Sequence, residues 1–214
     1  MDCLSGTMTM NARRLVMEVE FKNSKTKENL MRAFAGESQA RNRYTYAAEQ
    51  AHKQKLYVLE EVFKFTAEQE RAHGKVFYEF LTELSGENIE IDGSYPVDIS
   101  ESLEELLGMA EHNENEEHDN VYRAFEEMAR QEGFQKIAGA FHMIGKVEKV
   151  HADRFAQFRK WMQDNQLFVS DVSTTWMCLN CGHVIDAKEA PEVCPVCGEN
   201  QGYFVRITLA PYSS

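Results

Sequence analysis

Apolar residues recur along four stretches of the chain at alternating steps of three and four residues. The stretches cover approximately 26–54, 57–84, 102–131 and 137–163. This pattern places the apolar side chains on one face of a helix and is typical of the inward seam of a helix bundle. Neither 1–95 nor 97–190 contains proline, so long helices are permitted. The sequence therefore predicts four long helices, with a longer connection at 86–100 between the second and the third.

The predicted helices carry ionisable side chains on their apolar faces, near the middle of each seam. These residues are Glu37, Glu70, His73, Glu114, Glu117, Glu148 and His151. In the third stretch the expected seam runs Leu103, Leu107, Ala110, Glu114, Glu117, Val121, Phe125 and Met128. An unpaired charge inside a bundle is strongly destabilising, so seven such groups at one level need compensation. Two metal ions bound among them would supply it.

The candidate ligands recur in the two halves of the chain. Glu37 and Glu114 lie 77 residues apart. The pairs Glu70-x-x-His73 and Glu148-x-x-His151 lie 78 residues apart. Residues at i and i+3 point to one face of a helix, and two lone glutamates with two Glu-x-x-His pairs are typical of di-iron and di-manganese carboxylate bundles. We therefore expect two related helical hairpins, one crossover and a site for iron or manganese.

Three further residues are candidates for chemistry at this site. Glu117 exceeds the basic ligand count, and its counterpart in the first half is Ala40, so the two metals would have unequal surroundings. For Glu117 alone, the alternative is a solvated acid within an acidic run. Tyr44 and Tyr122 follow the lone glutamates by about two helical turns. Either hydroxyl is a candidate to bind a ligand or a substrate, and the alternative is ordinary core packing.

The C-terminal segment differs in character from the rest of the chain. Two knuckles, Cys178-Leu-Asn-Cys181-Gly and Cys194-Pro-Val-Cys197-Gly, stand among short β-type runs such as 203–207. Paired C-x2-C motifs predict a small module stabilised by one metal rather than by a large hydrophobic core. Two disulfides are the weaker interpretation, because no secretory context is evident. Four sulfur ligands suit zinc or a single iron, and the spacing alone does not choose between them.

Composition narrows the range of functions. The 214 residues include 23 Lys and Arg against 35 Asp and Glu, which gives a formal net charge of −12. A chain this acidic is poorly suited to binding nucleic acid. No apolar run is long enough to span a membrane, and no signal peptide is recognisable. We therefore expect a cytoplasmic protein with neither a nucleic-acid nor a membrane partner.

Five segments of the chain resemble the rubrerythrin family. They are AFAGESQARNRY at 33–44, EQERAH at 68–73, ENEEHDNVY at 114–122, EKVHADRF at 148–155, and CLNCG with CPVCG within 178–198. The resemblance extends from about Ser24 to about Ala210, and AGESQARNRY is highly specific for the family. It implies an all-α, ferritin-like four-helix bundle with one long crossover, followed by a small rubredoxin-like β domain.

The resemblance also implies cofactors and an activity. The seven carboxylate and histidine side chains would hold two non-haem iron ions, and the four cysteines would hold one more as an FeS4 centre. Glu117 and His73 would compete for one iron as its oxidation state changes. The implied reaction is reduction of hydrogen peroxide to water in oxygen-sensitive cells. Electrons would come from rubredoxin or an NADH-dependent flavoprotein reductase, and the working unit would be an antiparallel homodimer or a higher even oligomer.

Two other classes of function compete with this one. A ferritin-like ferroxidase that stores iron is compatible with the carboxylate–histidine pattern, but a storage cage has no need of an appended electron carrier. A zinc-ribbon interaction protein is the second alternative. A small oligomer argues against storage, and a red visible spectrum argues against zinc.

The sequence also predicts where the parts of the chain begin and end. We expect an N-terminal extension at 1–23, the bundle at 24–165, a linker at 166–173 and the cysteine domain at 174–214. The extension, which contains the isolated Cys3, is interpreted as a flexible tail or an over-extended start. A transit-like segment is the weaker alternative, because Arg13 and Arg14 lie in an acid-poor stretch. The fourth helix should end near Gln163, with the cysteine module beyond that end.

Overall fold

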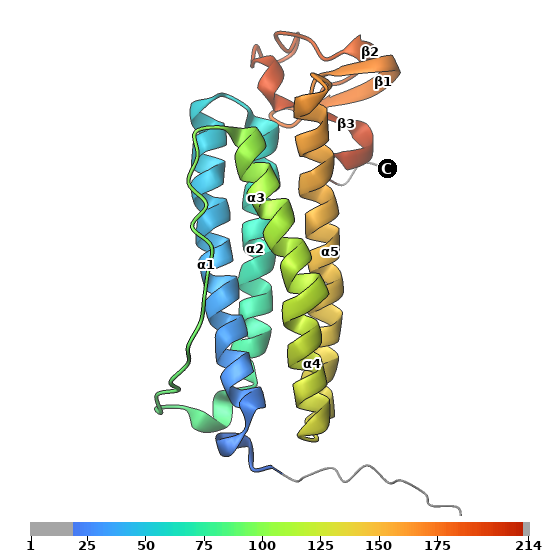
Figure 1. The fold of residues 1–214 in the computed structure, drawn as a ribbon. Helices are drawn as coiled ribbons and strands as arrows, with labels where there is room; N and C mark the ends of the chain where they lie inside the picture. The colour runs from blue at the N-terminus through green and yellow to red at the C-terminus, as the bar shows by residue number, and fades with distance from the viewer. Residues whose placement is uncertain (1–18, 212–214) are drawn as a thin grey trace, which may run out of the picture.

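The computed structural model describes residues 19–211 and contains four long helical rods that lie side by side (Figure 1). The rods are α1 (Lys25–Lys53), α2 (Tyr57–Glu79), a third rod made of α3 (Leu103–Glu116), a π-helical turn (Glu117–Val121) and α4 (Tyr122–Gln131), and finally α5 (Gln135–Gln163). A β-sheet domain follows at one end of the bundle. This arrangement confirms the predicted four-helix bundle and the small C-terminal β domain.

Short polar signals set the ends of the helices. The Ser24 hydroxyl accepts a hydrogen bond from the Lys27 amide at 3.0 Å and caps α1. Ser102 caps α3 in the same way through the Glu105 amide. Lys55, with a φ of 59°, turns the chain between α1 and α2. With these caps and turns, the two helices of each hairpin run antiparallel, and the middles of all four rods face one another.

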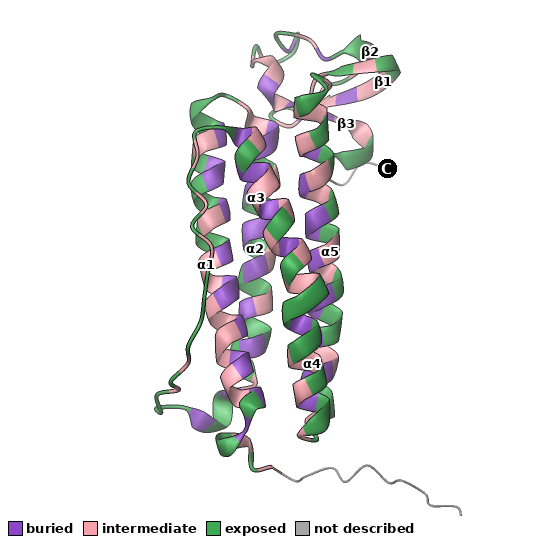
Figure 2. Cartoon of the chain, viewed as in Figure 1, coloured by how far each residue is buried: buried purple, intermediate pink, exposed green. Residues whose placement is uncertain are grey.

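Burial follows the predicted seams in three of the four rods (Figure 2). In the third rod the prediction holds for Leu103 through Glu114 and is wrong at Val121. Val121 is 37% exposed, whereas its neighbour Tyr122 is 2% exposed. The reason is the π-helical turn, which adds one residue to a helical turn and rotates the following face by one position.

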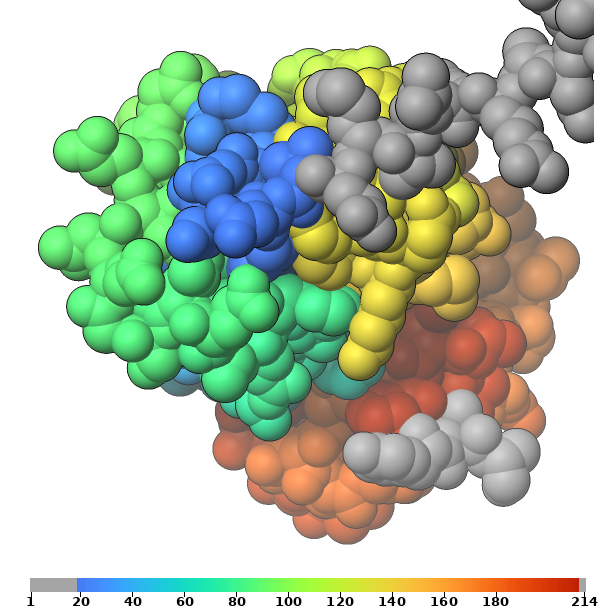
Figure 3. Space-filling model, turned by 90° about the horizontal axis from the view of Figure 1, so that it is seen from below, coloured from blue at the N-terminus to red at the C-terminus, as the bar shows by residue number. Residues whose placement is uncertain are grey.

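The crossover between the two hairpins runs along one side of α1 (Figure 1), and seen from below its residues lie beside the beginning of that helix (Figure 3). The Tyr95 hydroxyl donates to the carbonyl oxygen of Arg32 at 3.1 Å, and the Arg32 guanidinium pairs with Asp92. Further along, Arg43 pairs with Asp98, and both side chains are largely buried. Polar contacts therefore hold the crossover, residues 86–100, against α1, and we call this segment the strap.

The β domain is a three-stranded antiparallel sheet with the order β2-β1-β3. Its strands are β1 (Val169–Cys178), β2 (Val184–Glu189) and β3 (Phe204–Arg206). Residues 166–173, predicted to be a linker, thus contain the beginning of β1, because Val169 already pairs with Glu189. Trp176, Phe204 and two of the cysteines form a separate small core.

This β domain packs onto the bundle end at which α1 turns into α2. The ring of Tyr203 stacks on that of Tyr57, with centroids 4.0 Å apart, and Val205 joins the apolar core of the bundle. A Cβ atom at Gly202 would lie 1.9 Å from the backbone oxygen of Lys55. The sequence predicts a module beyond α5, and the structure shows it seated on the α1–α2 turn as well.

We expect Gly202→Ala to loosen this packing, because a backbone oxygen cannot swing aside as a side chain can. The free energy of unfolding should fall by about 1–3 kcal/mol, and protease should cleave the junction between bundle and β domain sooner. Gly139→Ala is a matched control, since nothing lies within 4 Å of its added Cβ. It removes a glycine from the interior of α5 and should stabilise the protein slightly. Equal protease resistance of the two variants would contradict this packing.

Most of the predicted N-terminal extension, including Cys3, lies outside the described residues. Within its described part, Phe21–Asn23 form one 3-10 turn, and the ring of Phe21 packs edge-on against Phe134. Over residues 19–211, no helix is both long and apolar enough to cross a membrane.

Candidate metal centres

The structure gathers the predicted carboxylates and histidines at the middle of the bundle. Glu37 comes from α1, Glu70 and His73 from α2, Glu114 from α3, and Glu148 and His151 from α5. All of them except His73 are at most 1% exposed, and the His73 side chain is 12% exposed. Each side chain stands on a seam that is otherwise mostly apolar, which is why the helices bury it.

These side chains form two groups that share two members. Glu37, Glu70, His73 and Glu148 make one group, and Glu70, Glu114, Glu148 and His151 make the other; within each, the ligand atoms lie within 4.8 Å of one another. His73 Nδ1 is 3.1 Å from Glu148 Oε1, and His151 Nδ1 is 2.9 Å from Glu70 Oε1. The shared glutamates thus stand between two positions suited to a cation.

Unsatisfied polar atoms test whether metal ions fit here. In residues 19–211, buried side-chain atoms without a hydrogen-bond partner include Glu37 Oε2, Glu70 Oε1, Glu114 Oε2, both carboxylate oxygens of Glu148 and both ring nitrogens of His151. Buried polar groups are normally hydrogen-bonded, so a cluster of this kind requires a ligand. Oxygen and imidazole donors suit divalent iron or manganese, and the residues therefore fit a two-metal centre.

The pKa values of these groups in the metal-free protein also indicate a site for cations. Burial, Glu148 and Glu70 raise the pKa of Glu37 well above its usual range. Burial lowers the pKa of His151, but the close carboxylates of Glu114, Glu148 and Glu70 outweigh it and raise that pKa to about 12. In the metal-free protein these groups would thus retain protons, and bound cations would replace those protons.

Tyr44 and Tyr122 support the cluster reciprocally. The Tyr44 hydroxyl donates to Glu114 Oε1, and the Tyr122 hydroxyl donates to Glu37 Oε1. Burial, followed by the nearby glutamates, raises the pKa of both hydroxyls well above the usual value, so each remains a donor. Each tyrosine holds the lone glutamate of the opposite half, as the internal repeat predicts for equivalent positions.

Glu117 stands apart from both groups of ligand atoms. It begins the π-helical turn, and its side chain lines a pocket of about 330 Å³ on the α1 side of the third rod. Burial, Glu114 and Glu148 raise the pKa of its carboxyl well above the usual range. π-helical turns are frequent at functional sites, and sequence reasoning missed this one.

A signal for the turn was nevertheless present in the sequence. Tyr44 follows Glu37 by seven residues, whereas Tyr122 follows Glu114 by eight. Seven residues make two α-helical turns and return to the same face; eight do so only when one residue is inserted. The change of repeat spacing from 77 to 78 residues therefore marks the π-helical turn.

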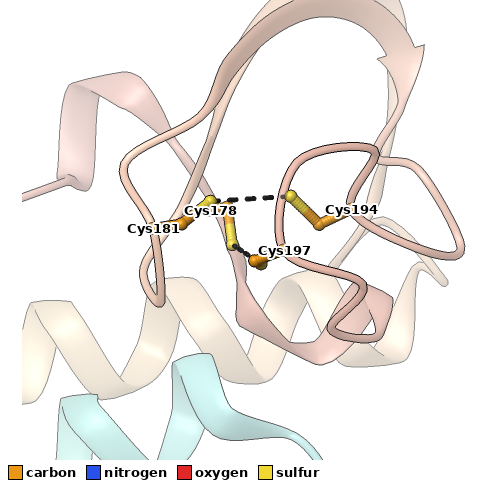
Figure 4. Close-up of side chains that lie close together, drawn as sticks. All are labelled: Cys178, Cys181, Cys194 and Cys197. Atoms are coloured by element: carbon orange, nitrogen blue, oxygen red, sulfur yellow. Dashed lines mark hydrogen bonds between the residues drawn. The ribbon is translucent and has the colours of Figure 1, made fainter.

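The four cysteines converge in the β domain (Figure 4). The sulfurs of Cys178 and Cys197 lie 3.8 Å apart, and those of Cys181 and Cys194 lie 3.7 Å apart. A disulfide would bring a pair to ~2.0 Å. Metal–sulfur bonds of ~2.3 Å in a tetrahedron place sulfurs ~3.8 Å apart. The sulfurs therefore fit one tetrahedral metal ion.

The backbone has the same conformation at both pairs of cysteines. The Gly182 amide donates to the Cys178 carbonyl at 2.8 Å, and the Gly198 amide donates to the Cys194 carbonyl at 2.9 Å. Both glycines have φ near +78°, which other residues adopt only with strain. The glycine after each knuckle thus lets the loop fold back over its two sulfurs.

The fold and the two clusters define a ferritin-like carboxylate–histidine protein with an appended four-cysteine domain. Two family models match: "Rubrerythrin" over residues 28–159 and "Rubrerythrin, rubredoxin-like domain" over residues 176–205. The chain belongs to the rubrerythrin family. The family's di-iron site and its four-cysteine iron site correspond to the two clusters of side chains.

Named relatives support this assignment along most of the chain. Rubrerythrin-1 of Clostridium acetobutylicum is 44% identical over 86% of this chain and 94% of its own length. Rubrerythrin of Porphyromonas gingivalis is 44% identical over 88% and 92%, respectively. Rubrerythrin of Nitratidesulfovibrio vulgaris is 37% identical over 86% and 94%.

Solved structures agree in fold. Nigerythrin in a mixed-valence state matches 96% of this chain and all of its own, with a TM-score of 0.57 and 27% identity. Bacterioferritin of Desulfovibrio desulfuricans matches 66% of this chain and 82% of its own, with a TM-score of 0.59 and 20% identity. The second likeness shows the bundle fold alone.

Proposed function

We propose that the protein is a non-haem di-iron peroxidase that reduces hydrogen peroxide to two molecules of water. The observation that carries the proposal is the pair of four-residue groups sharing Glu70 and Glu148, with a pocket leading to Glu117 beside them. These two groups would hold two iron ions, which in the ferrous state would supply the two electrons that cleavage of the O–O bond requires.

The residues of the chain have distinct roles in this proposal. Glu37, Glu70, His73, Glu114, Glu148 and His151 hold the two ions, and Tyr44 and Tyr122 fix the lone glutamates by hydrogen bonds. Glu117 is the carboxylate on the pocket side. There it binds an ion or donates a proton to the oxygen that leaves when the O–O bond breaks. Apolar seams on either side exclude bulk water from the cluster.

The four cysteines complete an electron path. Cys178, Cys181, Cys194 and Cys197 would hold an iron ion, which would relay single electrons from an external donor to the bundle. Rubredoxin or an NADH-dependent flavoprotein reductase is the donor class that we propose. We place the protein in a reducing compartment, the cytoplasm, where the four cysteine ligands stay reduced instead of forming disulfides.

Iron oxidation for storage is the second candidate, because bacterioferritin shares the bundle fold. Gel filtration separates the two: a small oligomer fits the peroxidase, and a large cage fits storage. The visible spectrum separates both from a zinc-ribbon protein, because ferric thiolate is red and zinc thiolate is colourless.

A Glu117→Ala variant tests the proposed role of the pocket-side carboxylate. We expect it to retain iron in the bundle but to reduce hydrogen peroxide about 100-fold more slowly, a typical cost of losing an acid–base group. Iron content and peroxide consumption with a rubredoxin-linked NADH assay are the measurements. Glu127→Ala, which removes an exposed glutamate from α4, is the matched control. Undiminished turnover in Glu117→Ala would contradict the role.

A further inference from the structure

The pocket beside Glu117 lies between the crossover strap, α1 and the π-helical turn. Glu117 and Tyr122 line it, and the Tyr122 hydroxyl in turn donates to Glu37. Tyr95 lines it on the side of the strap, where its hydroxyl is fixed to the Arg32 carbonyl. The link between the pocket and the metal-binding cluster therefore runs through Tyr122, which lines the pocket and donates its hydroxyl proton to Glu37.

Its volume exceeds what hydrogen peroxide requires. The pocket measures about 330 Å³. One water molecule occupies ~30 Å³ in the liquid, and hydrogen peroxide adds only one more oxygen atom. Pockets of ~300–1,000 Å³ hold small organic molecules. A molecule that fills this space has a substituent of several carbon atoms on the peroxide group.

The lining suits an alkyl substituent. Ala33, Pro96, Val121 and Phe125 present apolar surface. Contact with these side chains removes an alkyl group from water, which favours binding. Glu117 supplies a polar contact for the peroxide oxygens.

The charged side chains around the pocket disfavour the binding of anions. The Arg32 guanidinium at the pocket pairs with Glu28 and Asp92, so its positive charge is already compensated. Glu116 adds a carboxylate to the lining beside Glu117. A hydroperoxide that carries its own carboxylate would meet repulsion here, whereas a neutral one would not.

We propose that this pocket binds neutral alkyl hydroperoxides of short chain, ROOH, with the O–O bond toward Glu117 and the alkyl group against Val121 and Phe125. The inference rests on the proposed peroxidase function and extends its range of substrates. The O–O bond breaks with two electrons from the reduced di-iron centre and two protons from solvent, and the products are ROH and water. The external electron donor then restores the two electrons.

The test compares hydrogen peroxide with tert-butyl hydroperoxide on the full-length, iron-loaded protein. We expect the wild type to reduce both. Val121→Phe narrows the pocket and should lower kcat/KM for tert-butyl hydroperoxide about tenfold relative to hydrogen peroxide, mainly through KM. Val121→Ala widens it and should shift the same ratio the opposite way. Val97→Phe is the matched control, because it makes the same substitution on the strap beside the pocket, at a residue that is 81% exposed and does not line the pocket.

A second readout does not depend on turnover. Ligand-observed saturation-transfer NMR follows the binding of tert-butanol, the product alcohol, to the oxidised protein. We expect a signal with the wild type and Val97→Phe, and a weaker one with Val121→Phe. Melting temperature and iron content establish that each variant is folded and loaded. A hydroperoxide with a carboxylate on its alkyl chain should be reduced more slowly than tert-butyl hydroperoxide.

The outcomes separate this inference from the function on which it rests. A wild type that reduces hydrogen peroxide but not tert-butyl hydroperoxide overturns the inference and leaves the peroxidase proposal in place. A wild type that reduces neither overturns the peroxidase proposal. If Val121→Phe slows both substrates by the same factor, or leaves the tert-butanol signal unchanged, the pocket does not select the substrate and the inference fails.

Discussion

The Glu70→Ala variant is expected to lose both metal ions from the bundle and to keep the iron of the four-cysteine site. Glu70 belongs to both groups of ligand atoms, so its removal takes one donor from each position at once. Loss of an outer partner of a metal ligand already weakens metal binding ~10–100-fold, and loss of a shared ligand should exceed the upper figure. Peroxide turnover should fall with the metal.

Iron analysis and the visible spectrum measure this outcome. The ferric–thiolate absorption should remain, because the cysteines lie in a separate domain with its own core. Glu68→Ala is the matched control: it removes an exposed glutamate two residues away on the same helix, where Glu68 pairs only with surface arginines. Two irons per bundle in purified Glu70→Ala would show that the ligand assignment is wrong.

Electron transfer between chains should be revealed by mixing two inactive variants. The β domain packs on the α1–α2 turn beside Tyr57, which precedes Glu70 by thirteen residues. At ~1.5 Å per residue, this end of the bundle lies ~20 Å along the axis from the centre of the metal cluster. Electron transfer weakens steeply over such a distance. The antiparallel dimer implied by the family resemblance would bring each cysteine site beside the partner's carboxylate cluster.

The experiment combines Cys178→Ser, which lacks the electron carrier, with Glu70→Ala, which lacks the peroxide site. Each pure variant should have little donor-linked activity, and co-refolded mixed dimers should recover part of it. Because Cys178 is buried, Cys181→Ser, at an exposed cysteine, provides an independent carrier-free variant. Purified heterodimers that recover nothing would instead support transfer within one subunit.

The helices and their seams could be predicted because burial is periodic and local. Alternating steps of three and four residues identify the buried face wherever a regular α-helix continues, and they fail at Val121, where the helix is no longer regular. The grouping of six site residues could be predicted because the two Glu-x-x-His pairs and the lone glutamates repeat. Their assignment as ligands stays a proposal.

The pocket and the packing of the β domain on the bundle could not be predicted in this way. Both depend on contacts between segments distant in sequence, such as Tyr95 on Arg32 and Tyr203 on Tyr57. No periodic pattern encodes such contacts. Gly202 is an example, because the backbone oxygen of Lys55 leaves no room for a side chain at this position.

The π-helical turn also has an evolutionary consequence. If two copies of one ancestral hairpin are placed face to face, every tyrosine–glutamate contact should occur twice, as it does between Tyr44 and Glu114 and between Tyr122 and Glu37. A single added codon after Glu114 accounts for the change in spacing between the copies. It keeps Tyr122 in its symmetrical place, whereas Glu117 stands by substitution where the first copy has Ala40. We infer that one inserted residue and one substitution in a duplicated hairpin were enough to make the two halves of the site unequal.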